Sequence, residues 1–368
     1  MRDPAKKYSS LKYTLDILET AYLLLIIFIF LLSGFSRNLA LGLFKFNANA
    51  YIITFLYVLI ASVVYYILSF PLSFYHSYIL EHKFSLSNQN LRDWLSDQLK
   101  SGIISYIIGL ILIYAFYYIL KTFGNYWWVI ISLFWIFFSL ILAKLLPVVI
   151  IPLFFKYKKL TDDTLRERVI ALAAKMKVKI LDVFEIDFSK KTLKANAAFV
   201  GTGSTRRVIL ADTLKDKYSY DEIEVILAHE FAHYRLRHLL KLIFINSAAT
   251  ILVFYFIFKT SAYILGIFGF SSLSEIAALP LLLIYFVLFG MIMQPFENYV
   301  SRALERNADK MALEVTGSKD AFISMMDKLA KQNLADRNPN PLIKFYFFDH
   351  PPIDERIAMA ELFVPEKP

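Results

Sequence analysis

Six long apolar runs constrain the fold of this chain more than any other feature. Each run is close to the roughly 17 to 25 residues that a helix needs to cross the hydrocarbon core of a bilayer. The runs cover residues 20–36, 51–72, 102–120, 122–143, 242–258 and 276–296. Inside a bilayer every backbone polar group must be bonded within the chain, which leaves the helix as the stable form of such a run. We therefore predict a mostly α, polytopic membrane protein with about six spans.

The basic residues predict which side of the membrane the polar segments occupy. Six spans leave both termini on one side, and 36 of the 40 Lys and Arg residues fall there. Only Arg37, Lys45, Lys121 and Lys259 fall on the other side. The positive-inside rule then places the termini and the large polar segments in the cytoplasm. No small-residue cleavage site follows the first run, so we expect a retained anchor in a prokaryotic inner or plasma membrane.

Composition limits the partners and the available metal ligands. Anionic lipid at the cytoplasmic leaflet accounts for the net charge of +9, and no nucleic-acid motif accompanies it, so we expect a lipid bilayer and no nucleic acid as partner. The chain has no Cys, which excludes disulfides, thiolate ligands and Cys nucleophiles. A metal site in this chain therefore depends on His, Asp and Glu.

The pentapeptide HEFAH places two imidazoles and one carboxylate on a single helical turn. His229 and His233 are four residues apart, so both side chains share one face of a helix and can bind the same zinc ion. The intervening Glu230 then lies beside the open coordination position. This spacing predicts a zinc hydrolase.

Sequence signals also predict the extent of the helix that carries HEFAH. Ser219 followed by Glu222 indicates a capping box, so the helix should begin near Tyr220. Because no Pro or Gly interrupts it, we expect one helix up to about residue 258, roughly 58 Å long. On such a helix His238 points away from the zinc. His76 and His82, at the end of the second span, are expected to be interfacial or packing residues.

The third ligand is expected from the polar segment 301–309, which follows the last apolar run. Glu305 and Asp309 are four residues apart and share a helix face, so Glu305 can bind the zinc while Asp309 accepts the outer N–H of a zinc-bound His. Two His, one Glu and an open water position form a catalytic zinc site of the thermolysin type. The alternative interpretation of this pair is a solvated helix face.

The spans divide the polar parts of the chain into two blocks on one side of the membrane. We predict a helix over 165–176 and strands over 183–187 and 208–211 in the first block, and mostly helix in the second. The two blocks must meet in space as one small α+β, zincin-like domain at the cytoplasmic face. The predicted organisation is a four-span region 1–155, the first half of the metalloprotease domain 156–241, two further spans 242–296, and the second half of that domain 297–368.

Several separated motifs together resemble a known family. They are HEFAH, the stretch SRALERNAD at 301–309, the sequence DHPP at 349–352 with Arg356, and the segments 71–84 and 187–212. In this order they resemble the integral-membrane family-48 zinc metallopeptidases, most closely the type I CAAX prenyl endopeptidases, over nearly the whole chain.

The resemblance implies one Zn²⁺ per chain, with His229, His233 and Glu305 as its ligands and Glu230 as general base. It also implies that Asp309 orients a ligating His, and that His350 and Arg356 stabilise the oxyanion. Asn196, Ala197 and Ala198 are implied to form an edge strand that pairs with extended substrate. A plain buried strand is the alternative for Ala197 and Ala198, and ordinary loop packing is the alternative for His350.

The expected function is therefore an integral-membrane zinc metalloendopeptidase that acts on a polypeptide or membrane-associated peptide, with or without a prenyl group. The chain departs from the eukaryotic prenyl endopeptidases in having six spans rather than seven, and in Phe231-Ala232 within the zinc motif. One alternative is a quality-control protease of the shorter, HtpX-like branch, which has fewer spans ahead of the zinc helix. A zinc-stabilised membrane scaffold without activity is another, and the nearly charge-free spans disfavour a transporter.

Overall fold

Six helices are long and apolar enough to cross a membrane in the computed structural model, which describes residues 3–46, 49–201 and 206–364. These candidate spans are Pro4–Leu32, Ala50–Lys83, Leu91–Thr122, Gly124–Phe154, His238–Ile267 and Ile276–Thr316. The prediction of a mostly α, six-span protein is confirmed. Each helix is longer than its apolar run because polar turns extend it beyond the hydrocarbon region.

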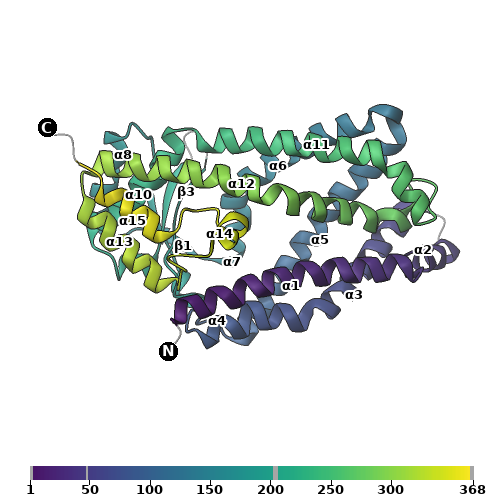
Figure 1. Ribbon diagram of the computed structural model, residues 1–368, viewed down its shortest axis with the longest axis horizontal. Helices are drawn as coiled ribbons and strands as arrows, with labels where there is room; N and C mark the ends of the chain where they lie inside the picture. Colours follow the sequence, from purple (N-terminus) through teal and green to yellow (C-terminus); the bar gives the residue numbers. More distant parts are fainter. Residues whose placement is uncertain (1–2, 47–48, 202–205, 365–368) are drawn as a thin grey trace.

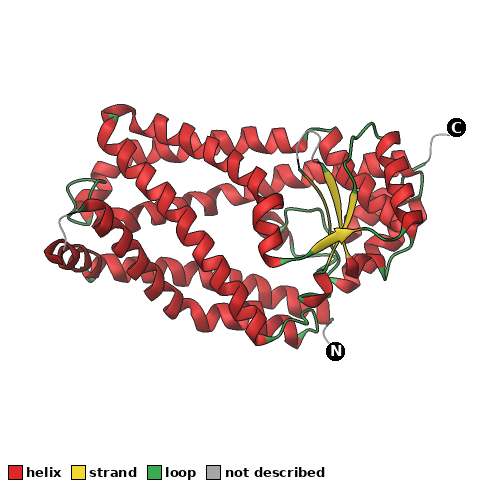
Figure 2. Ribbon diagram, turned by 180° about the vertical axis from the view of Figure 1, so that it is seen from behind, coloured by secondary structure: helices red, strands yellow, loops and turns green. Residues whose placement is uncertain are grey.

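The spans form an elongated bundle that carries a small sheet at one end (Figures 1 and 2). In the N-terminal half the α-helices are α1 (Pro4–Leu32), α2 (Phe35–Phe46), α3 (Ala50–Phe74), α4 (Leu80–Lys83), α5 (Leu91–Thr122), α6 (Trp127–Leu145) and α7 (Ile151–Phe154). Short π-helices, Tyr75–Ile79 and Leu146–Ile150, continue α3 and α6. Both termini of the described chain lie at the end of the bundle that holds the sheet (Figure 1).

Large apolar side chains cover the outside of the bundle. Ile67, Phe137 and Ile292 are 63%, 62% and 75% exposed, although each lies within a candidate span. Exposed apolar surface of this extent destabilises a protein in water but is the expected surface against lipid tails. The bundle is therefore built to be surrounded by a bilayer.

Polar contacts join the first helix to the end of the third. His76 Nδ1 lies 3.0 Å from Glu19 Oε1, and His76 Nε2 lies 3.7 Å from Asp16 Oδ1. Since each ring nitrogen faces a different carboxylate, His76 bridges α1 and α3. His82 instead lies against two backbone carbonyls, those of Tyr78 and Gln89. Both histidines thus stay outside the HEFAH site.

The sheet has four strands in the order β1-β2-β4-β3. They are β1 (Tyr157–Lys159), β2 (Val183–Ile186), β3 (Ala197–Val200) and β4 (Arg207–Ala211). The central pair β2 and β4 is parallel, with Val183 opposite Val208, whereas β1 and β3 join antiparallel at the two edges. The two central strands match the two predicted from the sequence. Strand β3 places residues 197–200 at an edge of the sheet.

Helices from both polar blocks pack around this sheet. They are α8 (Asp163–Lys175), α9 (Asp212–Lys215), α10 (Tyr220–Arg235), α13 (Lys319–Gln332) and α15 (Ile353–Glu361), whereas α14 (Pro341–Phe347) packs against the long helix of the last span. Their fully buried side chains, including Leu165, Ile223, Phe231 and Phe322, form one core with the strands. The two blocks, separated in sequence by two spans, therefore make a single small domain.

The helix that carries HEFAH is shorter than predicted. Helix α10 begins with the predicted capping box: Ser219 Oγ accepts from the Glu222 backbone N–H, and Glu222 accepts from the Ser219 backbone N–H. It ends at Arg235, and α11 (His238–Ile267) starts after a break. Arg237 adopts the left-handed conformation with φ +56° and ψ +36°. The prediction of one unbroken helix was wrong, because a non-glycine residue in this conformation ends a helix without any Pro or Gly to announce it.

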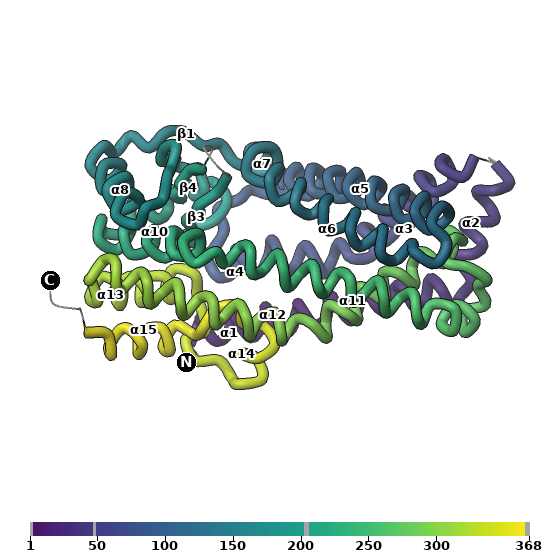
Figure 3. The backbone as a smooth tube through the Cα atoms, turned by 90° about the horizontal axis from the view of Figure 1, so that it is seen from above, coloured from purple at the N-terminus to yellow at the C-terminus, as the bar shows by residue number. Residues whose placement is uncertain are grey.

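Helix α12 (Leu279–Thr316) joins the last span to the soluble domain without a break. It lies beside α11 along the bundle and packs against α10 at the end with the sheet (Figure 3). Ala228 and Ala232 of α10, and Ala308 and Ala312 of α12, are completely buried. Small side chains at such positions let two helix backbones approach closely, which brings the face of α12 to the HEFAH motif.

Candidate metal centre

The two histidines of HEFAH point at the same place. His229 and His233 lie one turn apart on α10, and their Nε2 atoms are 3.1 Å apart. His229 is buried and His233 is about three-quarters buried, with its side chain 28% exposed. A pair of imidazole nitrogens in this arrangement can hold one metal ion.

Glu305 completes a set of three donors. Its Oε2 lies 3.1 Å from His229 Nε2, and its Oε1 lies 3.2 Å from His233 Nε2. One ligand atom from each of these residues lies within 4.8 Å of the other two. The spacing of Glu305 and Asp309 on a helix face thus reflects a site rather than a solvated surface, since both carboxylates are buried.

The donors fit a zinc ion. Glu305 Oε2 is buried and lies 3.1 Å from His229 Nε2, while Glu305 Oε1 faces His233 Nε2. Two imidazole nitrogens and a carboxylate that converge in this way can hold a cation between them. A donor set of two imidazoles and one carboxylate is that of catalytic zinc sites, which keep one coordination position for water.

Asp309 and Arg356 lie behind His229. Asp309 Oδ1 is 2.8 Å from His229 Nδ1, and Arg356 Nε donates to Asp309 Oδ2 at 2.7 Å. Burial, the largest effect, lowers the pKa of His229, but Asp309 and Glu305 outweigh it and raise that pKa to about 9. A second guanidinium nitrogen of Arg356 also donates to Asp309. The residue that the resemblance implied as an oxyanion partner thus has both of these nitrogens on a carboxylate.

His238 lies behind His233. Its Nδ1 is 3.0 Å from His233 Nδ1, and its side chain is almost completely buried. The prediction that His238 points away from the site was wrong because it assumed an unbroken helix. The break at Arg237 turns the start of α11 back, so that His238 reaches the histidine five residues earlier. No Gly or Pro marks this break in the sequence.

Glu230 lies next to the metal ligands and is held away from bulk water. Burial raises the pKa of this carboxyl, while the neighbouring His229 and His233 act in the opposite direction. A raised pKa suits a carboxylate that must accept a proton and release it again near neutral pH. The position and environment of Glu230 are therefore those of a general base.

His350 approaches the centre from the loop before α15. Its Nε2 lies 3.5 Å from Glu305 Oε2, and its Nδ1 lies 2.9 Å from Asp349 Oδ1. Burial lowers the pKa of His350, but Asp349 and Glu305 outweigh it and raise that pKa above its usual value. About half of the side chain is exposed (53%), so a substrate can reach it. Asp349, which orients this ring, is adjacent in sequence but was not among the predicted site residues.

Strand β3 runs next to the HEFAH helix. Asn196 precedes it, and its backbone carbonyl accepts from the Ala211 N–H at 3.0 Å. Ala197 and Ala198 pair with β4 on one side only, so the other edge of β3 has no strand partner among the described residues. The ring of Phe199 packs edge-on against Phe231 of α10 at 5.2 Å between centroids. An extended peptide added to this edge would therefore run beside the metal centre.

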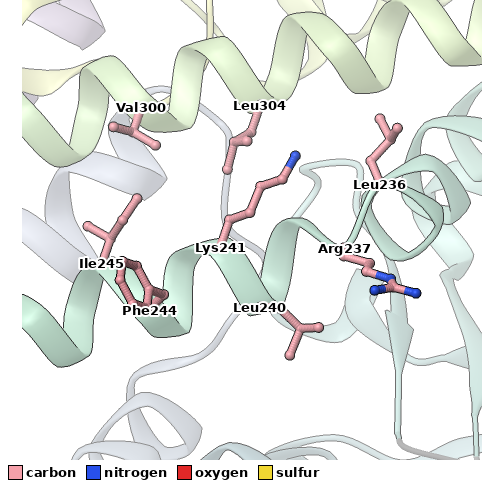
Figure 4. A pocket seen from close by; sticks show the side chains of 8 residues that line it. All are labelled: Leu236, Arg237, Leu240, Lys241, Phe244, Ile245, Val300 and Leu304. Atoms are coloured by element: carbon pink, nitrogen blue, oxygen red, sulfur yellow. The ribbon is translucent and has the colours of Figure 1, made fainter.

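A short groove lies between α11 and α12 (Figure 4). Its volume is about 570 Å³. Its lining is Leu236, Arg237, Leu240, Lys241, Phe244, Ile245, Val300 and Leu304. Leu304 precedes the predicted ligand Glu305 in α12. The groove thus presents apolar walls and two basic side chains within a turn or two of the site.

Comparisons with known proteins place the fold and the motifs in a wider context. Residues 3–156 match the family described as CAAX prenyl protease N-terminal, five membrane helices, and residues 159–362 match Peptidase family M48. Over the first range the structure has four candidate spans, with the 12-residue α2 between the first two.

Individual relatives match over most of the chain. This chain is 30% identical over 365 residues to the uncharacterized metalloprotease YhfN of Bacillus subtilis. The match covers 97% of this chain and 84% of the relative. It is 30% identical over 321 residues to CAAX prenyl protease 1 of Saccharomyces cerevisiae, covering 81% and 69% of the two chains. The crystal structure of S. mikatae Ste24p superposes with a TM-score of 0.87 at 24% identity, covering 97% of this chain and 88% of that one. The last match shows a shared fold.

Proposed function

The chain belongs to peptidase family M48, and from this premise we propose that it hydrolyses peptide bonds with a zinc ion held by His229, His233 and Glu305. It is a multi-pass membrane metallopeptidase. The single observation that carries the zinc proposal is the convergence of these three donors, whose ligand atoms lie within 4.8 Å of one another around the buried carboxylate of Glu305.

The residues around the ligands would each have a different role in hydrolysis. A bound zinc supplies Lewis acidity and lowers the pKa of water. Glu230 would accept the proton of the attacking water and pass it to the leaving amine. His350 would donate its Nε2–H to the oxygen that becomes negatively charged in the transition state, with Asp349 holding the ring in that orientation. Arg356 would act through Asp309, on which two of its nitrogens are placed.

The substrate is proposed to be an extended peptide that carries an apolar group. Asn196 to Ala198 lead into an edge strand that can bind the main chain of such a peptide without reading its side chains. The groove between α11 and α12 offers apolar walls for an isoprenoid or acyl chain next to the ligands. Several relatives carry the name CAAX prenyl protease, which agrees with a prenylated peptide as substrate.

The excess of basic residues supports an orientation with the metal centre in the cytoplasm of a prokaryotic cell. Prenylated or emerging polypeptides that reach the cytoplasmic leaflet would then be available to the site. Accessibility of single Cys residues introduced at Lys45 and Lys319 tests this: a membrane-impermeant thiol reagent added to whole cells should label only the first.

The first test is the zinc content and activity of the detergent-purified protein beside Glu230→Gln. We expect one zinc per chain in both, and loss of cleavage in the variant because the proton acceptor is gone. Substrates should include a farnesylated CAAX peptide, the same peptide without the farnesyl group, and an unfolded polypeptide. Cleavage of the unfolded polypeptide alone would favour a quality-control protease, and absence of zinc in the wild type would overturn the proposal.

A further inference from the structure

His238 is a buried polar residue with a single polar contact. Its side chain is 1% exposed, and its Nδ1 lies 3.0 Å from His233 Nδ1. The two rings meet edge-on, with centroids 5.0 Å apart and planes at 78°. Its Nε2 has no hydrogen-bond partner among the described residues. Among the described residues, the one polar side-chain contact of His238 is therefore with Nδ1 of His233, the ring nitrogen that faces away from the proposed metal.

Two Nδ1 atoms at this distance need one proton between them. His233 Nε2 faces Glu305 and the other imidazole, so this nitrogen must carry a lone pair if it is to bind a metal. In a neutral ring the proton then lies on His233 Nδ1. His238 Nδ1 must accept it in a hydrogen bond, which places the His238 proton on Nε2. With a metal on His233 Nε2, the contact is compatible with only one tautomer of each ring, in which His233 Nδ1 donates and His238 Nδ1 accepts.

A packing role alone does not account for this arrangement. A buried imidazole with one unpaired nitrogen is less favourable than an apolar side chain of similar size. The backbone that brings it there is also unfavourable, because Arg237 adopts a left-handed conformation without being Gly. Both features reduce stability, and together they bring His238 Nδ1 to His233.

We propose that His238 is a positioning residue, which fixes the ring and the tautomer of His233 by accepting a hydrogen bond from its Nδ1–H. The role rests on the proposed function, because it presupposes a metal ion at His229, His233 and Glu305. Many metal-ligating histidines donate their other ring N–H to a neighbouring group. Removal of that group commonly weakens metal binding 10- to 100-fold. His238 differs from most such groups in being another histidine rather than a carboxylate or a carbonyl.

The test compares two variants of nearly equal shape in the full-length, detergent-purified protein. In His238→Asn the amide oxygen can occupy the place of Nδ1 and accept the bond, whereas His238→Leu has no acceptor there. Zinc affinity is measured by competition with a chromophoric chelator, and thermal unfolding is measured on the metal-free proteins. We expect about 10- to 100-fold weaker zinc binding for His238→Leu. We also expect its metal-free thermal stability to be equal to or above that of the wild type, and His238→Asn to recover most of the affinity.

The Co²⁺-substituted proteins give a readout that does not depend on activity. The visible absorption of Co²⁺ reports ligand geometry, so His238→Leu should change the band pattern and His238→Asn should keep it. If His238→Leu does not fold, His238→Ala takes its place, since it also lacks the acceptor.

Each outcome separates the inference from the proposed function. A wild type that binds no zinc overturns both. A wild type that binds zinc, beside a His238→Leu variant that binds it equally tightly, overturns only the role of His238. Equal losses in the Leu and Asn variants would mean that ring shape matters rather than the hydrogen bond, and would also overturn it.

Discussion

The two histidines of HEFAH are supported in different ways on the two sides of the metal centre. On the side of the soluble domain, His229 contacts a buried carboxylate, Asp309. Arg356 of α15 donates a hydrogen bond to the same carboxylate. On the side of the membrane, His233 contacts a single nitrogen, Nδ1, of another imidazole, His238. An ionic support is strong but needs every partner in place, and it is costly near lipid. Of the two supports behind the HEFAH histidines, the charged one is thus the one that the soluble core encloses.

The largest effect is expected when the charged support is broken. Arg356→Met leaves the buried Asp309 with only the protonated His229 as a cationic partner, so stability should fall by about 3 kcal/mol, the lower end of the cost of breaking a buried ion pair. Thermal or denaturant unfolding of the purified, metal-free variant measures this loss. The corresponding change on the other side, His238→Leu, should not reduce stability.

A double variant sharpens this prediction. Asp309→Leu combined with Arg356→Met removes both charges, so most of the lost stability should return while zinc affinity stays low. If the double variant is as unstable as Arg356→Met, the packing of the guanidinium rather than the ion pair stabilises this side.

The histidine–carboxylate contact between His350 and Asp349 should affect the rate instead of stability. His350→Ala removes the proposed oxyanion donor, so kcat should fall about 10²- to 10³-fold with zinc content unchanged. Asp349→Asn, which keeps the ring but weakens its orientation, is the matched control and should lose less. Loss of zinc from His350→Ala would show that this residue supports the metal and not the transition state.

Zinc binding should release a proton from His229. The pKa of His229 is raised to about 9 in the metal-free protein, so zinc must displace a proton below that pH. Zinc affinity should therefore rise about tenfold per pH unit between pH 7 and 9. The same shift stabilises the metal-free fold fully below the ordinary His value, and this contribution is lost as the pH rises through about 9. Calorimetry in two buffers of different ionisation enthalpy counts the protons.

Asp309→Asn provides the comparison for this measurement. Without the carboxylate the raised pKa of His229 should fall, and the dependence of zinc affinity on pH should flatten. A wild-type affinity that is independent of pH over this range would contradict the assignment of a charged support to His229.

The smallest effect concerns the break between α10 and α11. Arg237→Gly relieves the left-handed conformation and should stabilise the fold by about 1 kcal/mol without changing zinc affinity. Arg235→Gly, in the helical backbone two residues earlier, should instead destabilise by about 0.5–1 kcal/mol. A change in zinc affinity with Arg237→Gly would show that the side chain of Arg237 also contributes to the site.

The contrast between the two sides also explains what could be predicted from the sequence. The six apolar runs and the capping box at Ser219 are local patterns, so the spans and the start of α10 followed from them. Glu305 and Asp309 share a helix face, and this spacing suffices to predict one side of the site. His238 could not be predicted, because its position depends on a left-handed Arg237 that only the packing of α10, α11 and α12 determines.

Asp349 illustrates a second limit. It lies directly before His350, and adjacent residues carry no periodic signal that distinguishes an orienting carboxylate from a solvated one. The edge position of β3 likewise depends on the sheet order, in which a strand later in the chain inserts between β2 and β3. Residues 196–198 alone do not contain that information.

Helix α12 sets the reach of the enzyme. It runs unbroken from the last span to Glu305, which lies nine residues beyond the end of the apolar run at Phe296, or roughly 13 Å along the axis. The distance between the end of the apolar run and Glu305 is therefore set by the length of one continuous helix. For a substrate held in the bilayer by its own anchor, the length of α12 would determine how far from the anchor the metal centre meets the chain. The bond that is cut would be chosen by its distance from the anchor more than by the residues on either side of it.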